Sequence, residues 1–367
     1  MQRKVAVVAQ KQINSADVGM PRERMLYELV KSLYEEVGIS RDDIDTFVLC
    51  SNDFNAGHTI SNVFEDCPVG AYMKDETKVE ADGVWAATYA LARILSGLYE
   101  TALVVGNSQG GSVMRPYLMM DYQLAPVYDR QLGLLNELSA AGLQAHAFLA
   151  KKGLTPDTLD EIAARNLADA AKNPDAFNGK AGASAADVAA TDMLYEPLRK
   201  GHCYPFTDGA CALLIASEEK AKKLTDRPAW IRGVGDSIDT YYPERDVVDV
   251  KSVKLAGERA AAMAGIGLKD LDLVELSAKF AHQEPILLEG LGLPADGGAA
   301  SVSPSGGAFG AYAFNAAGLV RIAECFKQLT GSAGDTQVEG AGYALAHGQD
   351  GLCMQHNAVM IMSSEEG

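Results

Sequence analysis

The stretch VEADGVWAATYALARILSG, residues 79–97, has the pattern of a strand end, a tight turn and a helix. Such a junction often mounts a catalytic nucleophile, because the positive end of the helix dipole stabilises an anion. No cysteine or serine occurs between Val79 and Leu95. Asp82 at the turn is therefore either a general base or simply the N-cap of the helix that follows.

Composition excludes several classes of function. The 367 residues carry a formal net charge of −17, which would repel nucleic acid and an anionic membrane surface. The six cysteines form no CxxC pair, so we expect no structural zinc site in this chain and reduced thiols in a reducing compartment. No apolar run approaches the roughly 18–20 residues that a membrane span needs. We therefore expect a cytoplasmic protein without a metal.

The first part of the chain has the pattern of alternating strands and helices. Apolar strands are predicted at 4–9, 45–51 and 101–106, and helices at 21–37 and 83–96. Residues 107–200 differ: a loop rich in Gly, Met and Tyr precedes helices predicted near 131–152, 155–172 and 184–190. A later helix is predicted at 314–329, with Tyr312 at its start. A long excursion such as residues 107–200 often builds a binding site.

The second part repeats the first. VGISRDDIDTFVLCS (37–51) and AGIGLKDLDLVELSA (264–278) share Gly-Ile and Asp-x-Asp at identical spacing, and each precedes an apolar strand. The period of about 227 residues indicates a duplicated domain rather than a solenoid. We divide the chain into an N-terminal half, 1–225, with an inserted loop domain at about 107–200, and a C-terminal half, 226–367.

Four segments resemble motifs of the thiolase superfamily, in particular of its sterol-carrier-protein-x and acetyl-CoA acetyltransferase-like members. The resemblance implies an α/β fold of two duplicated βαβαβ halves in five αβαβα layers, and a homodimer. Coenzyme A thioesters would be substrates, with no covalently bound cofactor. The segments are FTDGACALLIASEEKAKKL (206–224), LVELSAKFAHQEPILLEGLGL (273–293), SPSGGAFGAYAFNAAGLVRIAECFKQLTG (303–331) and ALAHGQDG (344–351).

The chain departs from the family at the residues that do its chemistry. Asp82 stands where the nucleophilic cysteine is expected, with Glu80 or Gly83 as the alternatives if the register differs. Ser277 and Ala278 replace a His-Asp pair, and Tyr312 replaces the histidine of a Gly-His-Pro motif. Chemistry through an acyl-cysteine is excluded if this alignment holds.

Tyr312 has two interpretations. Some thiolase-like proteins that the chain resembles lack the cysteine, use a tyrosine near this position and cleave β-hydroxyacyl-CoA by a retro-aldol step. Alternatively, the tyrosine fills a disused cavity. The retro-aldol relatives work with a small partner made of a zinc ribbon and an OB-fold, and have a second tyrosine where this chain has Ser277.

Other candidate residues also have two interpretations each. Gly306 and Gly307 either let backbone N–H groups approach a thioester or form a tight turn. His347 matches the family's last loop and could bind an enolate oxygen. Cys353 is either a second catalytic thiol or, as we favour, a core thiol inside a strand. Met114 and Tyr117 belong to a stretch that forms either an apolar substrate channel or a dimer interface.

His282 and Glu284 are expected at the start of a helix, where first-turn stabilisation explains the acid without a catalytic role. Three functions then remain open. The first is a cysteine-independent lyase that makes or breaks a C–C bond beside a CoA thioester, with Tyr312 as base. The second is a catalytically silent subunit that holds an active thiolase or OB-fold partner, and the weakest is an ordinary thiolase with a displaced nucleophile.

Overall fold

The computed structural model describes residues 3–53, 60–110, 124–125, 127–134 and 136–367. Its strands form one ten-stranded sheet in the order β10-β9-β11-β12-β8-β1-β7-β4-β2-β3. The helices are α1 (Arg22–Val37), α3 (Ser61–Val69), α4 (Gly83–Leu95), α6 (Glu137–Lys152), α7 (Asp157–Ala170), α8 (Ala185–Ala189), α9 (Glu218–Leu224), α10 (Lys251–Ala264), α11 (Gln283–Gly290), α12 (Gly307–Gly310) and α13 (Ala317–Thr330). The sheet strands are β1 (Val5–Ser15), β2 (Thr46–Cys50), β3 (Asp75–Val79), β4 (Thr101–Gln109), β7 (Asp208–Ser217), β8 (Ala229–Ile238), β9 (Leu273–Glu275), β10 (Ser301–Val302), β11 (Tyr343–Asp350) and β12 (His356–Ser363), and β5 (Met193–Tyr195) pairs with β6 (Leu198–Arg199).

The two halves of the sheet have the same strand order, which confirms the predicted duplication. Read inward from their outer edges, they run β3-β2-β4-β7-β1 and β10-β9-β11-β12-β8, and they meet through a short β1–β8 ladder. The repeated Gly-Ile motif has the same structure twice, because Gly38 and Gly265 both end a helix in the left-handed conformation. A 3-10 turn follows each, at Arg41–Asp43 and Leu268–Asp270.

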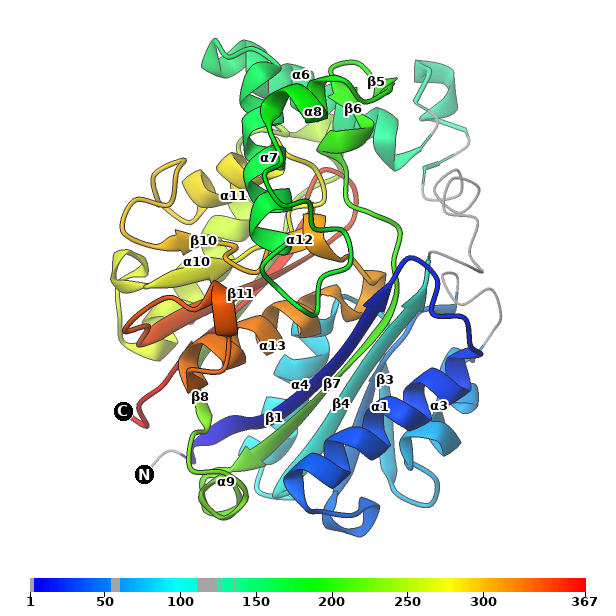
Figure 1. Ribbon diagram of the computed structural model, residues 1–367, viewed down its shortest axis with the longest axis vertical. Coiled ribbons are helices and arrows are strands. Elements are labelled where there is room, and N and C mark those ends of the chain that lie inside the picture. Colours follow the sequence, from blue (N-terminus) through cyan, green and yellow to red (C-terminus); the bar gives the residue numbers. More distant parts are fainter. Residues whose placement is uncertain (1–2, 54–59, 111–123, 126, 135) are drawn as a thin grey trace.

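Five layers result, as predicted. Helices α4 and α13 lie between the two half-sheets, in a core to which both helices and strands of both halves contribute (Figure 1). The helices pack closely because Gly83 has no side chain: a Cβ there would lie 2.4 Å from Leu319 Cγ. Helix α1 covers the outer face of the N-terminal half, and α10 and α11 cover that of the C-terminal half.

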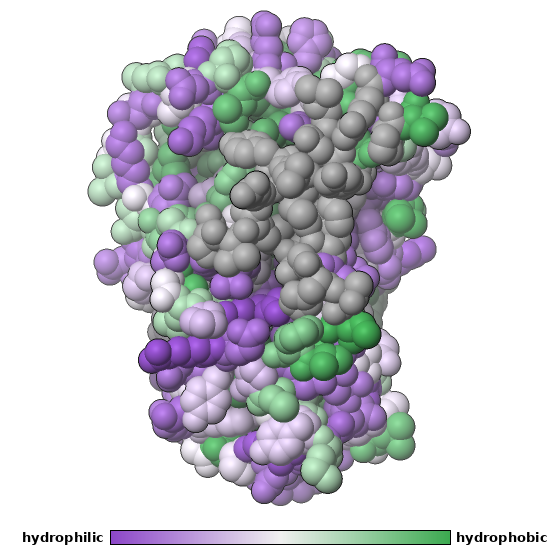
Figure 2. Space-filling view, turned by 90° about the vertical axis from the view of Figure 1, so that its right-hand side faces the viewer, coloured by the Kyte–Doolittle hydropathy of each residue, from purple (hydrophilic) through white to green (hydrophobic). Residues whose placement is uncertain are grey.

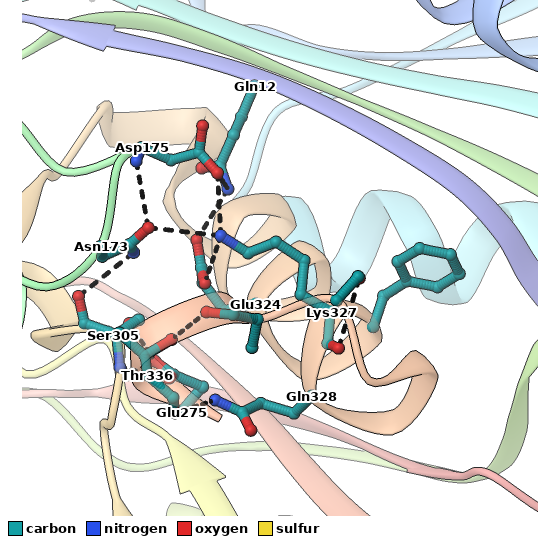
Figure 3. A network of polar contacts seen from close by, with 12 residues as sticks. Gln12, Asn173, Asp175, Glu275, Ser305, Glu324, Lys327, Gln328 and Thr336 are labelled. Carbon is teal, nitrogen blue, oxygen red and sulfur yellow. Dashed lines mark hydrogen bonds and ion pairs between the residues drawn. The ribbon is translucent and has the colours of Figure 1, made fainter. Parts of the chain in front are cut away.

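The chain between β4 and β7 carries α6, α7 and α8, which we call the loop helices. They sit above the C-terminal half in Figure 1 and share its hydrophobic core. A buried polar network also ties residues 173–175, just after α7, to α13 (Figure 3). Lys327 Nζ lies 2.8 Å from both Asp175 Oδ2 and Glu324 Oε2, and Gln12 Nε2 donates to Glu324 Oε1 at 2.7 Å.

Several predicted boundaries were wrong. Strand β1 continues to Ser15 instead of ending at residue 9, because it pairs with β7 along its whole length. The first loop helix begins at Glu137, not near 131, after a separate 3-10 turn at Arg130–Leu132. The sequence analysis also missed α3.

Two candidate residues lie in unexpected backbone settings. Tyr312 is in the irregular segment 311–313 after α12, not at a helix start, since α13 begins only at Ala317 after a 3-10 turn. Cys353 lies in the turn before β12 with a φ of 52°, not inside a strand. None of the helices in the described part of the chain combines the length and apolar character that a membrane span requires.

Candidate active site

Asp82 joins the starts of the two central helices. Its Oδ1 accepts a hydrogen bond from Val84 N at 3.1 Å, which caps α4, and its Oδ2 accepts from Gly318 N at 2.9 Å, in the first turn of α13. Glycines make room for the carboxyl group: a Cβ at Gly318 or Gly348 would lie 1.9 or 2.0 Å from Oδ1. The hydrogen bond from Val84 N is the one that the N-cap interpretation predicts.

The electrostatics of Asp82 are those of a buried acid. Burial raises its pKa to about 7, although the two backbone hydrogen bonds favour the carboxylate. With both oxygens bonded to N–H groups and only 4% of its surface exposed, the group is held in place. A role as base stays a prediction.

Tyr312 lies in a cluster of aromatic rings. Its ring centroid is 4.8 Å from that of Tyr204 and 6.1 Å from that of Phe314, and only 3% of the residue is exposed. Its backbone N–H donates to Thr207 Oγ1 at 2.9 Å. Among the described residues, none forms a hydrogen bond with the Tyr312 hydroxyl. Within the described residues, the side-chain contacts that fix Tyr312 are therefore those of its ring.

A buried cation lies beside this ring. Lys279 Nζ is 5.7 Å from the ring centroid of Tyr312 and 2.7 Å from Glu137 Oε1, in the first turn of α6. The other oxygen of Glu137 accepts from the Tyr204 hydroxyl at 3.2 Å. Burial raises the pKa of Tyr312, and the Lys279 ammonium opposes that rise.

His347 is locked in one tautomer. Its Nδ1 accepts from Ser277 N at 3.4 Å, so Nε2 carries the proton that is shared with Asn357 Oδ1 at 2.9 Å. Burial lowers the pKa of His347 to about 4, so the ring is neutral at pH 7. The Ser277 hydroxyl next to it is buried and has no hydrogen-bond partner within the described parts of the chain. A buried donor of this kind is available to a ligand.

The predicted glycine pair meets protein, not open space. Gly306 and Gly307 have φ values of 88° and 55°, and a Cβ on Gly306 would lie 2.4 Å from that of Ala170. Their N–H groups donate to Ser303 O at 2.8 Å and Ser305 Oγ at 3.2 Å. Ligand contact by this pair stays a prediction. Met114 and Tyr117 lie outside the described residues.

No cysteine stands at the start of α4. All six are described, and the one beside the turn, Cys50, is buried, with Sγ donating to Ala81 O at 3.0 Å. Burial raises the pKa of Cys50 well above its usual value and that of Cys353 to about 12. Cys353 Sγ faces Ala140 O at 3.5 Å. Neither thiol has the environment of an activated nucleophile.

The remaining predicted residues bind to the loop helices. His282 Nε2 lies 3.0 Å from Gln144 Oε1, and burial lowers its pKa to about 3. Glu284, in the first turn of α11, is 2% exposed, accepts from Asn166 Nδ2 at 3.0 Å and forms an ion pair with Arg165. Within the described ranges, no group of three His, Cys, Asp or Glu side chains could hold a metal ion.

A cavity of about 410 Å³ is separated from Tyr312 by one aromatic side chain, that of Tyr204. It is lined by residues within 138–206 of the N-terminal half and by Phe309 of the C-terminal half, and Tyr204 both lines it and packs against the Tyr312 ring. Two lysines, Lys180 and Lys200, also line it. Its apolar walls are formed by Leu138, Leu167, Leu194, Phe206 and Phe309.

Comparison with known proteins identifies the fold and the family. Residues 237–364 match the family model "Thiolase C-terminal domain-like". The acetyl-CoA acetyltransferase of Methanothermobacter thermautotrophicus is 26% identical over 349 residues, covering 88% of this chain and 90% of that protein. Sterol carrier protein 2 of Gallus gallus is 29% identical over 54% of this chain and 40% of that protein. The chain belongs to the thiolase superfamily.

A solved structure, "Ltp2-ChsH2(DUF35) aldolase", has a TM-score of 0.85 with this chain at 20% identity and covers 98% of each chain. At that identity the likeness establishes the thiolase fold alone. Three residues around Tyr312 that were not predicted from the sequence join the candidate site, namely Glu137, Tyr204 and Lys279. Lys279 had a signal, since it is a lone cation in the apolar stretch VELSAKFA.

Proposed function

We propose that this chain is a thiolase-superfamily lyase that acts on CoA thioesters without a covalent nucleophile, with Tyr312 as the proton-transfer residue. The observation that carries the proposal is the contrast in hydrogen bonding. The carboxyl group of Asp82 is bound to two helix starts, whereas no residue in the described part of the chain forms a hydrogen bond with the Tyr312 hydroxyl, and the Tyr312 ring packs on Tyr204, which lines the cavity.

The step is a retro-aldol cleavage of a β-hydroxyacyl-CoA. Tyr312, as phenolate, takes the proton of the β-hydroxyl group, the Cα–Cβ bond breaks, and its electrons form the enolate of the thioester. The β-carbon leaves as a ketone or aldehyde. The Tyr312 phenol then returns the proton to the enolate carbon, which gives the shortened acyl-CoA. The buried Ser277 hydroxyl is our candidate for the donor to the thioester oxygen.

A zinc-ribbon and OB-fold partner and a homodimer belong to the same proposal. The partner is supported by the solved neighbour, which is an Ltp2-ChsH2(DUF35) aldolase. A contact surface is supported by the apolar patch in Figure 2, below the segments drawn in grey. The exposed apolar side chains on α3 and next to its two ends are Ile60, Val63, Phe64, Tyr72 and Met73.

A catalytically silent subunit that scaffolds an active partner is the second candidate. It is favoured by the satisfied polar atoms of Asp82 and His347 and by the burial of Tyr312. An ordinary thiolase with a displaced nucleophile is the weakest candidate, because burial raises the pKa of Cys50 and Cys353. Cytoplasmic location remains a prediction.

Product analysis tests the proposal. The chain, copurified with whatever binds it in its host, would be given a panel of β-hydroxyacyl-CoA and β-ketoacyl-CoA thioesters, with products and the intact protein mass followed by mass spectrometry. We expect cleavage of β-hydroxyacyl-CoA and no acylated form of this chain. An acylated peptide would contradict the proposal. Cleavage that persists in Tyr312→Phe would assign the chemistry to a partner and support the scaffold.

A further inference from the structure

The buried ion pair of Lys279 and Glu137 connects two separate parts of the fold. Lys279 follows β9 in the C-terminal half, and Glu137 begins α6 in the loop helices. The two side chains are 10% and 6% exposed, and their charged atoms are 2.7 Å apart. Burying two charges costs free energy, so replacing such a pair by apolar side chains is often neutral or stabilising. A role in the chemistry would explain why Lys279 and Glu137 are buried as a charged pair.

The groups around the pair point to Tyr312. The Lys279 ammonium lies 5.7 Å from the Tyr312 ring centroid. The same lysine accepts a hydrogen bond from Tyr204 N at its backbone oxygen, at 2.8 Å, while the Tyr204 hydroxyl donates to Glu137. Tyr204 therefore holds both members of the pair, and its ring packs against Tyr312.

The charges that act on Tyr312 oppose one another. The carboxyl groups of Asp82, Glu137 and Asp350 disfavour a phenolate, as does burial, which raises the pKa of Tyr312. The Lys279 ammonium favours the phenolate. Burial lowers the pKa of Lys279, but the Glu137 carboxylate raises that pKa and keeps the ammonium charged.

We propose that Lys279 is a positioning residue for Tyr312: Glu137 and Tyr204 hold its ammonium beside the ring, where it stabilises the negative charge that forms when the phenol loses its proton. This inference rests on the proposed function, which makes Tyr312 the proton-transfer residue. It adds a residue that touches neither the substrate nor the transferred proton.

The test measures the ionisation of Tyr312 directly, without a substrate. A fluorinated tyrosine, whose phenol is more acidic than that of tyrosine, would be placed at position 312 of the full chain and titrated by 19F NMR. In Lys279→Met we expect the midpoint to rise by about one pH unit or more, as for loss of a nearby opposite charge. In Lys279→Arg, which keeps the charge, we expect most of that shift to disappear.

Glu137→Gln provides a second, opposite test over the pH range in which Lys279 stays protonated, because it removes a carboxylate that opposes the phenolate while the Lys279 ammonium remains. We expect its midpoint to fall. The double variant Lys279→Met/Glu137→Gln removes both charges with little change in shape, and its midpoint should lie between those of the single variants. If Lys279→Met does not fold, the direction of the Glu137→Gln shift decides.

Unchanged midpoints in Lys279→Met, or in Glu137→Gln, would overturn the proposal. It would also be overturned if Lys279→Arg shifted the midpoint as far as Lys279→Met, because packing rather than charge would then control the phenol. The outcome is separable from the proposed function. If these shifts occur while Tyr312→Phe keeps full activity in the assay above, the positioning holds and the lyase proposal fails.

Discussion

The two halves of this molecule bring different groups to its centre, Asp82 from the N-terminal half and Tyr312 from the C-terminal half. Both are almost fully buried. Asp82 has a backbone N–H group on each carboxyl oxygen and two glycines against it. Tyr312 has packing on its ring and a cation beside it, and within the described residues its hydroxyl has no hydrogen bond.

This difference separates a structural from a chemical use of a buried polar group. A carboxyl group that bridges two helix starts joins two parts of the fold, and any movement toward a substrate would break both hydrogen bonds. A phenol held by its ring alone can exchange its proton without disturbing its neighbours. The predictions below test this contrast, from the largest expected effect to the smallest.

The largest effect is expected from Asp82→Asn, as a function of pH. Asp82 has a folded-state pKa of about 7 and an ordinary value of 3.8, so between these values the unfolded chain ionises and the folded chain does not. Stability therefore falls as pH rises from about 4 to about 7, by roughly 4 kcal/mol from this group. The asparagine variant lacks this loss.

Urea unfolding of the wild type and the variant at several pH values measures that difference. Other buried acids, such as Glu275 with a pKa of about 7, titrate in both proteins and cancel in the comparison. A stability difference that stays constant from pH 4 to pH 7.5 would show that Asp82 is not the buried acid described here.

The next effect is expected from Gly348→Ala. Its Cβ would lie 2.0 Å from Asp82 Oδ1, and the carboxyl group is held by two hydrogen bonds, so we expect a loss of about 2–3 kcal/mol in unfolding free energy. In an Asp82→Ala background the clashing oxygen is absent, and the same change should cost less than about 1 kcal/mol.

Gly342→Ala is the matched control, because the nearest atom to its Cβ would be Asp272 Oδ2 at 3.6 Å. It should change the unfolding free energy by no more than about 0.5 kcal/mol. Equal costs for Gly348→Ala with and without Asp82 would contradict the fixed position of that carboxyl group.

The smallest effect on stability is expected from Tyr312→Phe. The ring contacts remain and no hydrogen bond within the described chain is lost, so the unfolding free energy should change by less than about 1 kcal/mol. Tyr204→Phe is the control, since its hydroxyl donates to buried Glu137, and it should cost about 1.5–3 kcal/mol. If Tyr312→Phe were the costlier change, the Tyr312 hydroxyl would have a structural role.

The architecture could be predicted from the sequence because short local motifs recur in the two halves. Gly38 and Gly265 are required by left-handed helix ends, and the motifs around them recur in both sequence and structure. Helix α3 was missed because it is short and contains Pro68. Cys353 was placed in a strand because its apolar neighbours suggested one. It lies in a turn with a positive φ, which the residue types there do not reveal.

The site was less accessible to sequence reasoning. Asp82 and Tyr312 could be found because each stands at a motif position. The partners of Tyr312 could not, because Glu137 and Lys279 are 142 residues apart and meet only when the loop helices pack on the C-terminal half. The second bond of Asp82, to Gly318 N, depends in the same way on the contact between α4 and α13.

The most direct test of the central claim is the ratio of turnover rates of wild type and Tyr312→Phe on the β-hydroxyacyl-CoA that the wild type cleaves best, measured on proteins with equal unfolding free energies. A group that transfers a proton in the rate-limiting step contributes about 10²–10⁴-fold, so we predict a loss of at least about 100-fold. Equal rates in the two proteins would contradict the account and leave Tyr312 as a packing residue.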